Sequence, residues 1–198
     1  MEDLTGIILC GGKSSRMGTN KALLKLDNLT FTERIAERLG EFCSEIILSV
    51  NSNDFDSLPF RKVMDKFSGI GPMAGIVSSL EESKSANNFI ISCDLPFISS
   101  EIISFLLNHK SAADIVAPVF KQKIQPLCSV IHKKVLPKFI AQISMKNYGP
   151  AYIFETCNAR FLPIEISDFP NADMNFLNIN HPEDYILAKA YFNNYNRP

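Results

Sequence analysis

The chain has 198 residues, of which 46% are hydrophobic and 21% charged, and its formal net charge is −1. A chain of this size forms one domain or two small ones and buries about 70% of its surface without disulfide or metal staples. The balanced charge excludes a strongly basic protein that binds nucleic acid. Five cysteines without a Cys-x-x-Cys pair, and the lack of any long apolar run, predict a cytoplasmic protein with reduced thiols, no signal peptide and no membrane span.

The first half of the chain alternates apolar runs with helical patterns. Strands are expected at runs too short for a helix, near residues 5–10, 45–50 and 88–93, with a weaker pattern at 61–64. The segment 11–21 is rich in Gly, Ser, Lys and Arg and is expected to be a loop. Apolar residues on one face predict a helix at 30–42, and another helix is expected to begin at Pro72.

The second half continues this alternation less regularly. Its expected elements are a helix capped by Ser99 or Ser100, strands at 114–119 and 126–131, and a helix at 135–143. Within 145–173 only 161–166 has the composition of a strand. Pro182 is expected to begin a final helix that ends near residue 192, with Asp184 placed to interact favourably with its N-terminal dipole.

Strands that alternate with helices predict the α/β class. We expect a single domain over residues 1–198, with a Rossmann-like three-layer α/β/α fold and a mostly parallel sheet. Ligands bind such sheets at the carboxyl ends of the strands. The loops 11–21 and 94–97 follow two of the expected strands, so they are the first candidates for a site.

The segment 9–21 reads Leu-Cys-Gly-Gly-Lys-Ser-Ser-Arg-Met-Gly-Thr-Asn-Lys. Glycines after a strand expose backbone N–H donors and let a ligand approach closely, while Lys and Arg neutralise phosphate charge. Together they predict a triphosphate-binding loop, although glycines with scattered cations alone also suit a solvated surface loop. Neither the Walker A spacing nor the Gly-x-Gly-x-x-Gly fingerprint of dinucleotide-binding proteins is present in the segment.

This string resembles the signature of the MobA-like nucleotidyltransferases, Leu-Ala-Gly-Gly-x-x-x-Arg-Met-Gly-x-x-Lys, and departs from it only at Cys10, where the family has Ala. The resemblance implies that the strand end and loop bind the nucleotide through Leu9, Cys10, Gly11 and Gly12. It also implies catalytic roles for Arg16 and Lys21, which would stabilise charge on the transferred and leaving phosphates.

Three further segments extend the resemblance. Residues 69–75 are similar to a Gly-Pro-Leu-Ala-Gly stretch of relatives that use GTP, which implies that guanine lies near Gly71. Cys93-Asp94-Leu95-Pro96 is similar to a Cys-Asp-x-Pro stretch whose Asp binds Mg²⁺, so Asp94 is expected to be catalytic and to hold the metal. Asn51 and Asp65 match positions that bind the nucleotide, with Asp65 near the base or ribose.

The C-terminal stretch Asn178-Ile179-Asn180-His181-Pro182-Glu183 is similar to the Asn-x-Asn-x-Pro-Glu stretch of the family. The resemblance implies that Asn178 and Asn180 lie near the acceptor side of the site. Read without the family, these residues suit the capping of the final helix. The lone Asp94, Asp65 and Asn51 after strands likewise suit ordinary turns.

The resemblance implies transfer of GMP from GTP to molybdopterin or molybdenum-molybdopterin, with release of pyrophosphate and with Mg²⁺ as cofactor. Its expected partners are GTP and the pterin, with maturation proteins of molybdoenzymes as further candidates. One alternative keeps the fold but uses CTP or another small phosphorylated acceptor. Another alternative is a non-catalytic adaptor that binds nucleotide, which the presence of both Lys21 and Asp94 argues against.

Overall fold

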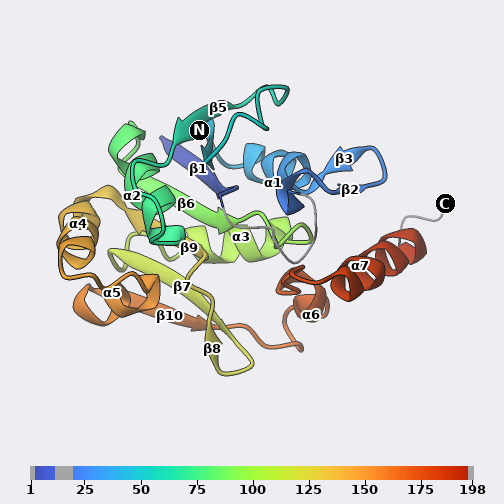
Figure 1. Cartoon of the computed structure of the whole chain (residues 1–198). Helices are drawn as coiled ribbons and strands as arrows, with labels where there is room; N and C mark the ends of the chain where they lie inside the picture. Colours follow the sequence, from blue (N-terminus) through green and yellow to red (C-terminus); the bar gives the residue numbers. More distant parts are fainter. Residues whose placement is uncertain (1–2, 12–19, 196–198) are drawn as a thin grey trace.

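The computed structural model describes residues 3–11 and 20–195, which fold around one central sheet (Figure 1). The sheet has the strand order β10-β7-β9-β6-β1-β4-β5, and β8 pairs with β7. Its strands are β1 (Leu4–Leu9), β4 (Glu45–Val50), β5 (Arg61–Met64), β6 (Asn87–Ser92), β7 (Ile115–Phe120), β8 (Lys123–Ile124), β9 (Cys128–His132) and β10 (Ala159–Pro163). A separate antiparallel hairpin is made of β2 (Lys25–Leu26) and β3 (Leu29–Thr30).

The sheet is parallel through β6, β1, β4 and β5, whereas β9 runs antiparallel between β6 and β7. The edge strand β10 is again parallel to β7. The predicted α/β class and mostly parallel sheet are therefore confirmed. Because β6, β1, β4 and β5 point the same way, the loops that follow them meet at one edge.

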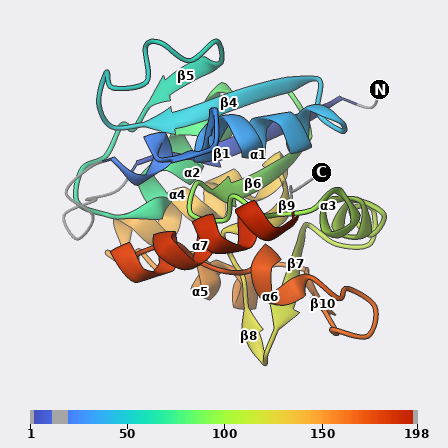
Figure 2. The same ribbon diagram turned by 90° about the vertical axis from the view of Figure 1, so that its right-hand side faces the viewer.

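Helices cover both faces of the sheet (Figures 1 and 2). They are α1 (Phe31–Gly40), α2 (Pro72–Glu82), α3 (Ser100–Leu107), α4 (Leu136–Ser144), α5 (Pro150–Thr156), α6 (Ala172–Asn175) and α7 (Pro182–Tyr195), with short 3₁₀ helices η1 (Lys21–Leu23) and η2 (Lys133–Val135). In the described part of the chain, no helix is long and apolar enough to cross a membrane.

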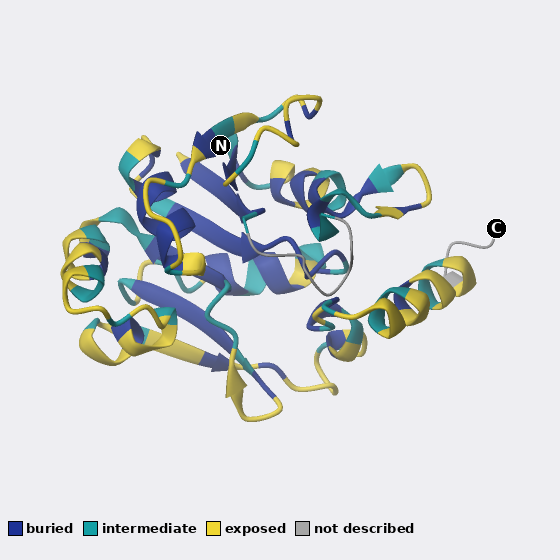
Figure 3. Cartoon of the chain, viewed as in Figure 1, coloured by how far each residue is buried: buried dark blue, intermediate teal, exposed yellow. Residues whose placement is uncertain are grey.

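The central strands are largely buried (Figure 3), and neighbouring apolar residues in them belong to two separate cores. Ile8 packs with the buried residues of α1 and α3, whereas Ile7 packs with those of α2, α4 and α5. Likewise, Ile91 of β6 belongs to the same core as Ile8, and Ile90 belongs to the same core as Ile7. This explains the continuous apolar runs of the sequence, because a strand covered on both faces has no polar side.

Local signals fix where the helices begin. Thr30 accepts a hydrogen bond from the backbone N–H of Glu33, and the Glu33 carboxylate accepts one in return from the N–H of Thr30, which is a capping box for α1. Gly71 takes a φ of 63° directly before α2, with Pro72 in its first turn, and Ser99 caps α3 as expected. These three helix starts agree with the sequence prediction.

The sequence reading fails chiefly within 145–173. This segment forms α5, α6 and the strand β10, which lies at 159–163 rather than at 161–166. The reason is that β10 is an edge strand in which only Leu162 is buried, so it has no continuous apolar run. The short β2, β3 and β8 strands were also not predicted, nor was the 3₁₀ turn at 21–23, which begins at the last residue of the expected loop.

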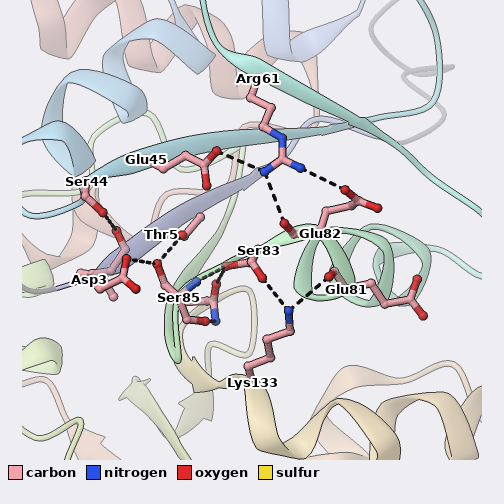
Figure 4. A network of polar contacts seen from close by, with 12 residues as sticks. Asp3, Thr5, Ser44, Glu45, Arg61, Glu81, Glu82, Ser83, Ser85 and Lys133 are labelled. Carbon is pink, nitrogen blue, oxygen red and sulfur yellow. Dashed lines mark hydrogen bonds and ion pairs between the residues drawn. The ribbon is translucent and has the colours of Figure 1, made fainter.

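A polar network ties together the amino ends of the strands, opposite the edge where the loops of the parallel strands meet (Figure 4). The Ser85 hydroxyl contacts that of Thr5 at 2.8 Å and donates to the Asp3 carboxylate at 2.8 Å. Arg61 forms ion pairs with Glu45 and Glu82 at 3.2 and 3.0 Å. These contacts hold the amino end of the sheet together, whereas ligands of such sheets bind at the carboxyl edge.

Candidate nucleotide site

Four strand ends bring the predicted residues to the carboxyl edge of the sheet. Gly11 follows β1, Asn51 follows β4, Asp65 follows β5, and Asp94 comes shortly after β6. These strands are neighbours and parallel, so the four positions share one edge. The predicted residues Gly12 and Arg16 lie outside the described residues.

The strongest polar cluster at this edge joins Lys21, Asp94 and Asn180. The Lys21 ammonium donates to Asp94 Oδ2 at 2.8 Å and to Asn180 Oδ1 at 3.0 Å. The three residues come from η1, from the loop after β6 and from the segment before α7. The backbone N–H of Ile179 also donates to the carbonyl of Asp94 at 3.1 Å, which fixes this segment against the β6 loop.

Asp94 has one carboxylate oxygen without a partner. The residue is only 8% exposed, and among the described residues its buried Oδ1 accepts no hydrogen bond. An unpaired buried carboxylate oxygen is costly in an apoprotein, and it suits a site completed by a ligand or cation. No group of three or more His, Cys, Asp and Glu that could hold a metal occurs in the described part of the chain. A single carboxylate still fits Mg²⁺, since this ion commonly takes one or two carboxylates and completes its shell with substrate phosphates and water.

The start of α7 holds Asn180 in place. The Asp184 carboxylate accepts hydrogen bonds from the backbone N–H groups of Asn180 and His181 at 2.9 and 2.8 Å. The helix itself lies on the same side of the molecule as the β2–β3 hairpin (Figure 1), and its Tyr185 meets the ring of Phe31 edge-on at 5.9 Å. Asp184, expected to interact with the N-terminal dipole of the final helix, thus accepts two backbone hydrogen bonds at the start of that helix.

The structure places the two predicted residues Asn178 and Asn180 in different surroundings. Asn178 is exposed, and within the described part of the chain its side-chain amide donates to the nearby carbonyl of Phe176 alone, at 3.4 Å. Asn180 alone reaches the cluster with Lys21 and Asp94.

A second cluster surrounds Asp65. The Ser49 hydroxyl donates to Asp65 Oδ1 at 2.7 Å. A side chain at Gly11 would place its Cβ 2.9 Å from Asp65 Oδ2 and 3.8 Å from Asn51 Cγ, so these residues lie together around the end of β1. Burial raises the pKa of Asp65 above its usual value, and the Ser49 hydrogen bond opposes this rise.

Two of the predicted residues place their side chains in the core. Leu9 packs against α2, and Cys10 is buried on the opposite face with its Sγ 3.6 Å from the Thr32 hydroxyl. Burial raises the pKa of Cys10 to about 12, so this thiol is unreactive near neutral pH. Any contribution of these two residues to ligand binding falls to their backbone. Gly71 is exposed at the start of α2.

Sequence reasoning missed Ser49. A serine inside the apolar run of β4 is the one available signal, because a buried hydroxyl needs a partner. The sequence could not show that this partner is Asp65, which directly follows the neighbouring strand β5.

Ligands of mostly parallel α/β sheets bind at the carboxyl edge, and the paired Lys and Asp side chains found there suit a phosphorylated ligand with a cation. The sequence profile of the MobA-like NTP transferase domain matches residues 6–155. A probable molybdenum cofactor guanylyltransferase of Carboxydothermus hydrogenoformans is 33% identical over 190 residues, which span 93% of this chain and 94% of that relative. The chain therefore belongs to the family of MobA-like nucleotidyltransferases.

Solved structures agree on the fold. Molybdopterin-guanine dinucleotide biosynthesis protein A of Archaeoglobus fulgidus superimposes with a TM-score of 0.81 at 20% identity, over 96% of this chain and 99% of the other. A 4-diphosphocytidyl-2C-methyl-D-erythritol synthase of Anaerococcus prevotii gives a TM-score of 0.76 at 16% identity, over 97% and 96% of the two chains. The same fold thus occurs in proteins named for different nucleotides, so it does not determine the base.

Proposed function

We propose that this enzyme transfers GMP from GTP to molybdopterin, in its free or molybdenum-bound form, and releases pyrophosphate. The observation that carries the proposal is the partly buried cluster of Lys21, Asp94 and Asn180 at the carboxyl edge of the sheet. At one point it supplies a cation for phosphates and a carboxylate whose second oxygen has no partner among the described residues. The curated relative named for guanylyl transfer and the Gly69–Gly75 stretch support GTP as the donor.

The reaction is an in-line attack by the phosphate of molybdopterin on the α-phosphorus of GTP. The bond from the α-phosphorus to the bridging oxygen breaks, and pyrophosphate leaves with that electron pair. Lys21 stabilises the negative charge on the phosphates, and we assign the same role to Arg16 of the segment 9–21. No protein nucleophile is needed, because positioning and charge stabilisation account for such a transfer.

Asp94 is the residue that would hold Mg²⁺. When bound, the ion supplies neutralisation of phosphate charge and a template for the reacting oxygens. Asn180 would keep Lys21 beside Asp94 while the nucleotide enters. The Asp65 cluster, with Asn51 and the start of α2 at Gly71, is assigned to the nucleoside part of GTP.

A thermal-shift titration with GTP, CTP, ATP and UTP, each with and without Mg²⁺, tests the donor. A ligand at 100 times its Kd adds about 2.7 kcal/mol of stability, which corresponds to a rise in Tm of roughly 5–10 °C for a chain of this size. We expect a rise that is largest for GTP with Mg²⁺. A rise confined to CTP would identify CTP as the donor, and no rise with any nucleotide would contradict both the proposed function and the nucleotide-binding adaptor.

Turnover is then measured as pyrophosphate release from GTP in the presence of molybdopterin. Lys21→Met should lower kcat by about 10²–10³-fold, the usual effect of removing one charge-stabilising donor. Lys25→Met is the matched control, since Lys25 is exposed on β2 and only four residues away. Equal activity of the two variants would remove Lys21 from the mechanism.

A further inference from the structure

Ser49 is a buried polar residue that the proposed chemistry does not use. It is the fifth residue of β4, is 1% exposed, and interrupts the apolar run from Ile46 to Val50. Its hydroxyl donates to Asp65 Oδ1 at 2.7 Å, and its carbonyl accepts the backbone N–H of Cys10 at 2.9 Å. Ser49 therefore connects the end of β1 with the carboxylate that follows β5.

The hydroxyl of Ser49 fills a space beside α2 that is open because residue 75 is a glycine and has no side chain. A Cβ built on Gly75 would lie 2.2 Å from Ser49 Oγ and 3.0 Å from Leu9 Cδ2. The first distance is well below any real contact, so a side chain at this point of α2 would force the hydroxyl to move. Gly75 thus allows α2 to cover β4 while Ser49 keeps its hydrogen bond.

The hydrogen bond from Ser49 leaves the other oxygen of Asp65 available. Oδ1 is held by Ser49, whereas Oδ2 lies 2.9 Å from the Cβ position of Gly11 and has no hydrogen-bond partner among the described residues. Position 11 directly precedes the loop assigned to the nucleotide. A carboxylate fixed at one oxygen presents its second oxygen in a defined direction, which is what recognition of N–H or hydroxyl groups requires.

We infer that Ser49 is a positioning residue that fixes the Asp65 carboxylate toward the nucleoside of the donor, and that Gly75 preserves the space for its hydroxyl. This inference rests on the proposed function, since it assigns Asp65 to the base or ribose of the bound nucleotide. It adds a pair of residues on β4 and α2 that touch no substrate but determine how tightly the nucleotide binds.

A double-mutant cycle tests the inference. The Kd for GTP with Mg²⁺ is measured by calorimetry for Ser49→Ala, Gly75→Ala and the double variant, together with kcat and KM. We expect each single variant to raise the Kd about tenfold, since both release the Asp65 carboxylate, while kcat changes less than threefold. The double variant should bind no worse than Gly75→Ala, because the group that the new methyl displaces is already absent.

Matched controls separate positioning from stability. Ser79→Ala removes another buried serine hydroxyl, on α2, which has no hydrogen-bond partner among the described residues. Gly40→Ala adds a methyl group at a glycine with nothing within 4 Å of the new atom. Both controls should bind GTP as the unmodified protein does. If Gly75→Ala does not fold, Ser49→Ala with its serine control still decides the question.

The outcomes separate this inference from the proposed function. If the unmodified protein binds GTP and Ser49→Ala binds it equally well, the positioning role is refuted while the proposed function stands. An equal loss in Ser79→Ala, or additive losses in the double variant, would also refute it. If Asp65→Asn binds GTP normally, Asp65 does not contact the nucleoside and the inference fails with it. If the unmodified protein binds no GTP, the proposed function itself fails.

Discussion

Removing the charge of Lys21 should destabilise the protein in the absence of any ligand. In Lys21→Met the Asp94 carboxylate loses its ion pair at Oδ2, and Oδ1 already lacks a partner among the described residues. Breaking a fully buried pair from one side costs about 3–5 kcal/mol. The two side chains are 18% and 12% exposed, so we expect a smaller loss of about 2 kcal/mol. At roughly 2–4 °C per kcal/mol, Tm should fall by about 4–8 °C.

The double variant Lys21→Met with Asp94→Asn provides the check. It removes both charges together, so its stability should lie within about 1 kcal/mol of the original protein. The assay is thermal unfolding with a chelator and without nucleotide. Added salt should change the loss in Lys21→Met little, because buried pairs are weakly screened. If the double variant loses the sum of the two single effects, the pair is not coupled and the reasoning is wrong.

Three other perturbations test the surroundings of the site. Asp65→Asn should raise Tm at pH 7. Burial raises the pKa of Asp65, so the stability of the unmodified protein falls as pH rises through that pKa. The gain in Tm of the variant should vanish below pH 3.8, the pKa of Asp65 in the unfolded chain. Phe31→Ala should cost about 3–5 kcal/mol in denaturant unfolding, since the ring is fully buried between the hairpin and α7, and an unchanged midpoint would contradict this packing. Thr30→Ala should cost about 1 kcal/mol through loss of the capping box, measured in the same way, whereas the exposed Asn28→Ala should cost nothing measurable.

The sequence was most informative where local patterns coincide with burial. The paired apolar residues Ile7 and Ile8 predict a strand covered on both faces, and the two cores confirm it. Pro72 and Ser99 mark helix starts through backbone geometry that depends only on near neighbours. The parallel direction of the strands is enough to place four predicted residues at one edge of the sheet: Gly11, Asn51, Asp65 and Asp94.

Contacts between distant segments could not be predicted. Asn180 meets Lys21 across 159 positions, and no local pattern specifies such a pairing. The same limit hides the link between Ser49 and Asp65, and it made Asn178 and Asn180 look equivalent although only Asn180 reaches the cluster. The strand β10 has no hydrophobic pattern to predict it, because it is an edge strand with one buried residue and its sequence resembles that of a loop.

The attachment of Asn180 to Lys21 bears on the order in which the protein forms. The first strand and η1 are made early, but the amide that holds Lys21 belongs to a segment synthesised after every strand of the sheet. A ribosome-bound chain that ends at residue 156 contains most of the sheet and lacks this segment. Such long-range contacts form late, because the intervening chain must be ordered first. Under the proposed function the nucleotide site is complete only in the finished chain, so nucleotide binding would serve as a measure of complete folding.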